Sequence, residues 1–230
     1  MDYLHTALAP CFGDNSPECV RMLDKDLQVA AFAATKEISK LSPDQRSWEA
    51  IVSAFTTNPL LEEMDDSTVY IADNLIKENI NFFKFDGSPD KAVVTEVMTW
   101  FKKLVRDEDV VRATPIDIRQ LARIVAQTGA GIDWQNIITV VHNKEKHSKK
   151  VLDVGVLRYP DISHPYLKVY RIQLEAWSSC ERIGPCQRDS NGISGAYNCR
   201  KYKPRDDVIR RLKPEVLEMA AKAGEAFLLS

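Results

Sequence analysis

The stretch Leu167–Trp177, LKVYRIQLEAW, decides the fold of the back half of the chain. Its residues alternate between two faces. The residues expected to point inward are Tyr170, Ile172, Leu174 and Ala176, and those expected to point outward are Val169, Arg171, Gln173 and Glu175. Alternation with a period of two is typical of a half-buried strand in an antiparallel sheet.

The sequence on either side of this stretch predicts more strands. Residues 151–160, VLDVGVLRYP, place Leu152, Val154 and Val156 on one face of a preceding strand, and the charged run 143–150 before it is expected to be a loop. Farther on, Asn191-Gly192 is a strong hairpin signal, which would join residues near 186 to residues 197–202. These patterns predict an antiparallel meander of three or four strands.

The front half is punctuated by a short polar residue followed by proline, a pattern that favours the start of a helix because the polar side chain caps and proline presets φ. The four pairs are Ser16-Pro17, Ser42-Pro43, Ser88-Pro89 and Thr114-Pro115. Asp66-Ser67 is expected to begin a further helix. Apolar residues follow at helical spacing and form one stripe in each of three segments. After Asp66 the stripe is Ala72, Leu75, Ile76, Ile80 and Phe83; after Ser88 it is Val93, Val94, Val97, Met98, Phe101, Leu104 and Val105; after Thr114 it is Ile118, Leu121, Ala122 and Val125.

The predicted fold class is therefore α+β. An acidic helical bundle, residues 1–131, would pack against a basic β-rich region, residues 132–230, that ends in a helix from about Asp206 to Phe227. No sharp linker separates the two regions, so we expect them to share one core.

Composition bounds the class of protein. A hydrophobic content of 44% and a charged content of 28% are ordinary for a globular protein and exclude a disordered or collagen-like chain. No apolar run approaches the roughly 20 residues of a membrane span. Five unevenly spaced cysteines do not form a disulfide pattern. We expect a soluble protein of a reducing compartment, the cytoplasm or the nucleus.

Charge is divided unevenly along the chain. Residues 1–115 hold 12 Lys and Arg against 20 Asp and Glu, a net of −8, whereas residues 116–230 hold 19 against 13, a net of +6. The stretch 144–213 holds 16 basic against 8 acidic residues and five of the seven tyrosines. Such asymmetry favours a polyanion as the partner of the back half, although the two halves could instead pair with one another.

Cations interleaved with tyrosines on a sheet are what binding of unpaired nucleic acid requires, because cations neutralise phosphates and rings stack on bases. The candidate contacts are Lys144, Lys146, Lys149, Lys150, Arg158, Lys168, Arg171, Arg200, Lys201, Lys203, Arg205, Tyr166 and Tyr202. No recognised RNA-binding motif accompanies them. A solvated basic face and an anionic protein or membrane surface are the alternatives.

Metal and catalytic sites have weaker support. His142, His147, Cys180, Cys186 and Cys199 lack the close pairs of a zinc site. Asp161 and Glu175 could hold Mg²⁺ as in a nuclease, but the lysine that ordinarily follows such a glutamate is replaced by Trp177. We expect no cofactor and no metal.

These patterns predict a non-enzymatic protein that binds nucleic acid, single-stranded RNA in particular. Such a protein could self-associate as a coat, matrix or nucleocapsid protein does, and it could be a structural protein of a virus. A scaffold that assembles head to tail through its acidic and basic halves is the first alternative. A divalent-metal nuclease is the second.

Overall fold

The structure is a computed structural model of the 230-residue chain. It describes residues 4–12, 17–65, 67–78, 90–126, 142–161, 163–183 and 186–209, and residues 211, 214, 215, 218, 219 and 222. The strands are β1 (His5–Leu8), β2 (Leu61–Glu63), β3 (Val69–Glu78), β4 (His142–Tyr159), β5 (Tyr166–Ile183) and β6 (Cys186–Pro204). The α-helices are α1 (Pro17–Ser39), α2 (Trp48–Thr56), α3 (Lys91–Val105), α4 (Glu108–Ala113), α5 (Ile118–Val125) and α6 (Asp206–Ile209); 3-10 helices are η1 (Pro10–Phe12) and η2 (Pro43–Gln45).

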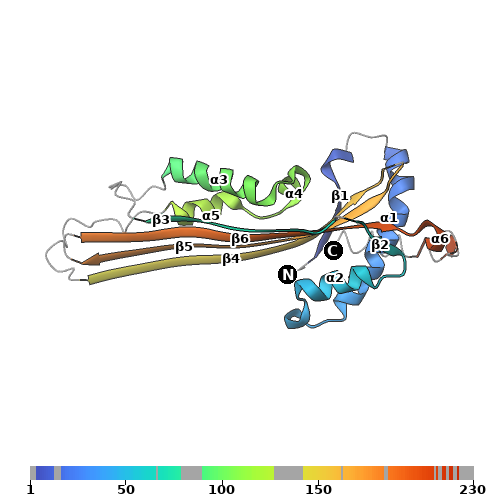
Figure 1. The fold of residues 1–230 in the computed structure, drawn as a ribbon, viewed down its shortest axis with the longest axis horizontal. Helices are drawn as coiled ribbons and strands as arrows, with labels where there is room; N and C mark the ends of the chain where they lie inside the picture. The colour runs from blue at the N-terminus through green and yellow to red at the C-terminus, as the bar shows by residue number, and fades with distance from the viewer. Residues whose placement is uncertain are drawn as a thin grey trace.

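A six-stranded sheet runs through the molecule in the order β1-β4-β5-β6-β2. β3 pairs with the same edge of β6 as β2 does, but with an earlier part of that strand. All neighbours are antiparallel except β1, which runs parallel to β4. The three central strands contain 18, 18 and 19 residues. At about 3.3 Å per residue they extend for about 60 Å, which gives the molecule its elongated shape (Figure 1).

Helices cover the two faces unequally (Figure 1). On one face α3, α4 and α5 lie along the sheet and form the first hydrophobic core with the side chains of β4, β5 and β6. On the other face α1 and α2 form the second core, only near the end where β1 and β2 lie, with Val154, Val156, Leu167, Val169 and Tyr202. Beyond α1 and α2, no described helix covers this second face, which we call the open face. Alternate residues of β3 (70–76), β6 (192–198), β5 (171–177) and β4 (148–152) point to it.

The predicted fold class is wrong. Strands are not confined to a meander after a helical bundle, because β1, β2 and β3 from the front half complete the central sheet. The segment expected to be a helix from Asp66 is β3 instead. Val69, Ile71 and Leu75 point to the first core, whereas Tyr70 and Ile76, at even-numbered positions, are exposed, which is the alternation of a strand.

The hairpin predicted at Asn191-Gly192 is also wrong, because both residues lie inside β6 and pair with β5 and β3. The Asn191 side-chain amide donates to the carbonyl of Val125 at 3.0 Å, which links β6 to the end of α5. Gly192 is required for close packing rather than for a turn, since a Cβ there would overlap the ring of Trp177. The pairing of Ile183 with Cys186 shows where β5 gives way to β6.

The apolar stripes predicted for α3 and α5 are confirmed. Val93, Val97, Phe101, Leu104 and Val105 are buried in α3, and Ile118, Leu121, Ala122 and Val125 are buried in α5. These two helices begin later than the proline pairs suggested, because Asp90 and Asp117 are the caps. Their carboxylates accept from the amides of Ala92 and Gln120 at 2.7 and 3.0 Å.

Both faces of β5 are buried near α1 and α2, which corrects one expectation. Tyr170, Ile172, Leu174 and Ala176 point into the first core as predicted, but Val169, expected outward, is fully buried in the second core. Leu152 shares a face with Val154 and Val156, but lies beyond α1 and α2 and is 49% exposed.

No described helix combines the length and the apolar character that crossing a membrane would require.

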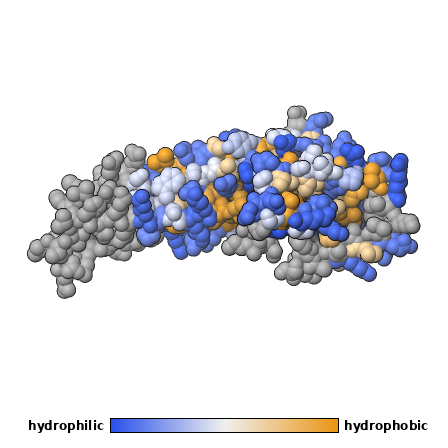
Figure 2. All heavy atoms as spheres, turned by 90° about the horizontal axis from the view of Figure 1, so that it is seen from below, coloured by the Kyte–Doolittle hydropathy of each residue, from blue (hydrophilic) through white to orange (hydrophobic). Residues whose placement is uncertain are grey.

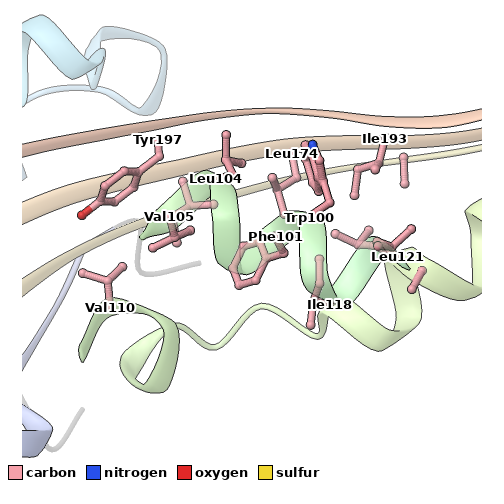
Figure 3. Packing of buried hydrophobic residues seen from close by; sticks show 14 of the residues in the cluster. Trp100, Phe101, Leu104, Val105, Val110, Ile118, Leu121, Leu174, Ile193 and Tyr197 are labelled. Carbon is pink, nitrogen blue, oxygen red and sulfur yellow. The ribbon is translucent and has the colours of Figure 1, made fainter. Parts of the chain in front are cut away.

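The contact between α3 and the sheet depends on Gly195 of β6. Trp100 and Leu104 point from α3 toward the sheet, where Leu174 and Ile193 lie (Figure 3). A Cβ on Gly195 would come within 2.7 Å of Leu104 Cδ2 and 3.0 Å of Trp100 Cη2. The absence of a side chain there lets the helix approach the sheet.

We expect Gly195→Val to destabilise the protein by about 1–3 kcal/mol because valine would overpack this contact. Ser194→Val is the matched control, since Ser194 is the preceding residue of β6 and points to the open face. Unfolding by urea measures both. A loss for Ser194→Val as large as that for Gly195→Val would contradict the packing described here.

Candidate functional site

The lysine-rich run that was expected to be a loop is part of a strand. Residues 144–150 lie in β4 and pair with residues 175–181 of β5. Lys144 is placed in the strand, but its side chain lies outside the described ones, and Lys146 is exposed. Lys149 Nζ donates to Gln120 Oε1 of α5, and Lys150 Nζ lies 3.2 Å from a carboxylate oxygen of Glu175. Lysines on a strand near a sheet edge discourage unwanted strand pairing.

Arg158 is buried in an ion pair on the side of the second core. Its Nε and Nη2 donate to the Asp24 carboxylate of α1 at 2.8 and 3.0 Å, and its Nη1 donates to the Thr6 hydroxyl at 2.9 Å. The Arg158 residue is 5% exposed and Asp24 is 4% exposed. Arg158 therefore joins α1 and β1 to β4 and is unavailable to a phosphate.

Lys168 makes a corresponding contact on the side of the first core. Its Nζ lies 2.7 Å from Asp107 Oδ2 and 2.7 Å from the Tyr159 hydroxyl, and the residue is 6% exposed. Asp107 is the cap of α4. Arg158 and Lys168 thus hold helices on opposite faces of the sheet, and burial removes both from the predicted interface.

The two predicted stacking tyrosines are also engaged. Tyr202 is fully buried, with its hydroxyl 3.2 Å from Thr56 Oγ1, so it offers no ring to a base. Tyr166 is half-buried and stacks on Tyr159 with ring centroids 4.3 Å apart. Burial raises the pKa of Tyr166 to about 12. Lys201 Nζ lies 6.0 Å from the centroid of its ring.

The basic residues near the end of β6 contact the acidic front half. Arg200 pairs with Glu63, and Lys203 Nζ lies 3.6 Å from Glu62 Oε1. Arg205 is exposed, and its Nε donates to the carbonyl of Leu61 at 2.9 Å. Together with the pairs of Arg158 and Lys168, these contacts show that four basic residues of the back half pair with acidic residues of the front half within one molecule.

The open face places Arg171, a predicted contact, beside residues that were not among the predicted contacts. The register places Tyr70, Asn198 and Arg171 in one row across β3, β6 and β5, and Ile76, Gly192 and Trp177 in another. Tyr70 is 65% exposed and Ile76 50% exposed. Figure 2 views this side, where hydrophobic and hydrophilic residues are mixed. The signal that could have located Tyr70 is the alternation of β3, which was interpreted as helical.

Arg171 is a predicted cation that lies on this face and is partly exposed. Its Nε and Nη2 donate to Asn198 Oδ1 at 3.2 and 2.9 Å. Its guanidinium carbon lies 5.5 Å from the centroid of the Trp48 ring at the start of α2. The side chain is therefore held at the boundary between the second core and the open face, with other N–H groups left to donate.

The structure separates the two carboxylates proposed for a nuclease. Asp161 accepts from the amides of Ser163 and His164 at 2.8 and 3.1 Å, as a turn residue does, and these bonds lower the pKa of its carboxyl. Glu175 lies on β5 nine residues from Tyr166, about 30 Å along the strand. Among the described residues, no cluster of three or more histidine, cysteine, aspartate or glutamate side chains is placed to hold a metal.

A buried polar cluster joins β1 to the sheet. Asp153 Oδ2 accepts from the Thr114 hydroxyl at 2.6 Å, Asp153 Oδ1 lies 3.4 Å from His5 Nδ1, and His5 Nε2 lies 3.0 Å from the Tyr170 hydroxyl. Burial raises the pKa of the Asp153 carboxyl, against the lowering effects of Thr114, His5 and Tyr170. The cluster fastens elements that are far apart in the sequence.

No protein-family model matches the chain, and no curated protein matches its sequence.

We expect Arg158→Met to destabilise the protein by about 3–5 kcal/mol, because it leaves the Asp24 carboxylate buried without its cation. Lys203→Met is the control, since its pair with Glu62 is half exposed and should contribute only about 0–1 kcal/mol. Urea unfolding compares the two variants. Similar small losses would contradict a structural role of Arg158.

We expect the stability difference between the wild type and Asp153→Asn to depend on pH. Because the pKa of Asp153 is raised in the folded protein, the wild type loses stability relative to the variant as pH rises from about 3.9, the unfolded value, through the folded value. Urea unfolding between acidic and neutral pH measures the difference.

Asp161→Asn should show the opposite sign, because the pKa of Asp161 is lowered. There the wild type loses stability relative to the variant as pH falls below about 3.9, towards the folded value.

If the stability difference between the wild type and Asp153→Asn did not change with pH, this result would contradict the proposed cost of burying the Asp153 carboxyl.

Proposed function

We propose that this chain is a non-enzymatic protein that binds single-stranded nucleic acid on the open face of its sheet. The observation that carries the proposal is the 65% exposure of Tyr70 in the same cross-strand row as Arg171. An exposed ring offers a face on which an unpaired base can stack, and a neighbouring cation can neutralise a phosphate.

The rest of the open face supports the same chemistry. Trp177 is partly exposed and lies six residue pairs along the sheet from the row of Asn198, which provides a second ring. Between the rings lie Asn74, Ser194 and Gln173, whose polar groups can bond base edges. Lys150 and Lys146 point to the same side of β4, and the Lys150 side chain is 75% exposed. Compared with the contacts predicted from the sequence, the proposed interface omits the buried cations Arg158 and Lys168. It keeps Arg171, Lys146 and Lys150 and adds the rings of Tyr70 and Trp177.

The alternative of head-to-tail assembly through opposite charges has less support. Lys203 and Arg200, which such an assembly would use, contact Glu62 and Glu63 of the same molecule. These charges therefore pair within the folded molecule rather than remaining for contacts between molecules.

We expect Tyr70→Ala to weaken binding of a fluorescein-labelled 20-nucleotide oligouridylate by about 1–3 kcal/mol, the contribution of one stacked base. Tyr70→Phe keeps the ring and should bind as the wild type does. Fluorescence anisotropy at low salt measures the affinity. Because Tyr70 is exposed, neither change should alter the unfolding midpoint.

The salt dependence provides an independent check. Lys150→Gln should reduce the slope of log affinity against log salt concentration by about 0.7, the contribution of one phosphate contact. Lys203→Gln, which changes a lysine paired with Glu62 away from this face, should leave the slope unchanged. Absence of binding by the wild type, or equal binding by Tyr70→Ala, would remove the proposal.

A further inference from the structure

The outer edge of β4 is only partly used by the sheet. β4 runs from His142 to Tyr159, but β1 pairs only with Gly155–Arg158. In the part of the chain that the structure describes, no strand lies beside residues 144–152 on this side. The inner side of the same residues is fully paired with β5.

The backbone groups that point outward can be assigned from the contact with β1. The carbonyl of Arg158 accepts from the amide of Ala9 at 2.9 Å, so the backbone groups of Arg158 point away from β5. The register between β4 and β5 is continuous, and outward-pointing residues therefore recur at every second position. Lys146, Ser148, Lys150 and Leu152 present their amides and carbonyls at this edge. Such groups are a template for another strand.

Charge decides which strand this edge can accept. Lys146 is exposed, Lys150 has a side chain 75% exposed, and Lys144 and Lys149 lie in the same segment. Antiparallel pairing with β4 of a second copy, centred on Ser148, would place Lys146 opposite Lys150. Like charges directly opposite one another destabilise a strand pair, whereas opposite charges stabilise it. A strand with carboxylates at alternate positions is the complementary ligand.

We infer that the β4 edge binds an acidic, extended segment of a partner protein as an added strand. Main-chain bonds to Lys146, Ser148 and Lys150 supply affinity, and the lysine side chains select for carboxylates. In the register centred on Ser148 the edge thus disfavours pairing with its own copy, whereas an acidic strand is favoured.

This site shares the side chains of Lys146 and Lys150 with the proposed nucleic-acid interface, but its main-chain bonds at the β4 edge are distinct from the stacking surface around Tyr70. Tyr70 belongs to β3, which lies across β6 and β5 from β4. A change in the outward backbone of Ser148 should therefore leave stacking on Tyr70 unaffected, and Tyr70→Ala should leave strand addition unaffected. The two proposals can fail independently.

The test uses the full chain and a fluorescein-labelled ten-residue peptide that alternates glutamate with threonine. We expect saturable binding by anisotropy, and Ser148→Pro should weaken it by about tenfold or more because proline removes an outward N–H donor. Proline is tolerated at an edge position whose N–H faces solvent. Ser148→Thr keeps the donor and is the matched control, with unchanged affinity expected.

A second peptide keeps the charges but has proline in place of two central threonines, so that it cannot add as a strand. Its failure to bind the wild type would support strand addition even if Ser148→Pro did not fold. Equal binding of both peptides would show charge attraction alone and overturn the proposal. Absence of binding by the glutamate-threonine peptide, or an unchanged affinity in folded Ser148→Pro, would also overturn it.

Discussion

The pairing of β5 with both neighbours over nearly its whole length is the constraint on which the structure depends. β5 pairs with β4 from Tyr166 to Ile183 and with β6 from Leu167 to Ile183, so the backbone of this strand is enclosed by the sheet. Its side chains then have two environments: alternate residues enter the first core, and the others enter the second core or reach the open face. The environments differ because the helix cover is unequal: α3, α4 and α5 bury one face, whereas α1 and α2 bury only part of the other.

Buried ion pairs reinforce this arrangement at the end where both faces are covered. Leu157 is opposite Lys168 and Arg158 is opposite Leu167 on β4 and β5, so the two cations lie on adjacent rungs but on opposite faces. Each reaches a carboxylate of the front half, Asp107 or Asp24. Their contribution is best understood as specificity of placement, since the cost of desolvating a buried pair offsets much of its attraction. The charge asymmetry of the chain is therefore explained in part by ion pairs between acidic residues of the front half and basic residues of the back half.

Local patterns predicted what depends on local contacts, and failed where the partner is distant. The stripes of α3 and α5 and the alternation around Ile172 were readable because each reflects one buried face. β3 was misassigned because Leu75 and Ile76 suit a helix as well as a strand, and only pairing with β6 decides between them. Asn191-Gly192 resembles a turn locally, yet the carbonyl of Val125 and the ring of Trp177 account for both residues. Among the candidate site residues, sequence could identify the cations, but it could not tell Arg158 in its buried pair from Arg171 at the open face.

The partnership of β1 with β4 also has a consequence for synthesis. His5 leaves the ribosome about 150 residues before Gly155, its partner in the sheet, and at about 5–20 residues per second the interval is roughly 8–30 s. β3 similarly waits for β6, because Val69 pairs with Cys199. During this interval the front strands have no sheet to join, and their apolar side chains are open to other contacts. Translation speed and early chaperone binding would therefore influence the yield of this protein more than they would that of a helical bundle, whose contacts form between neighbouring segments.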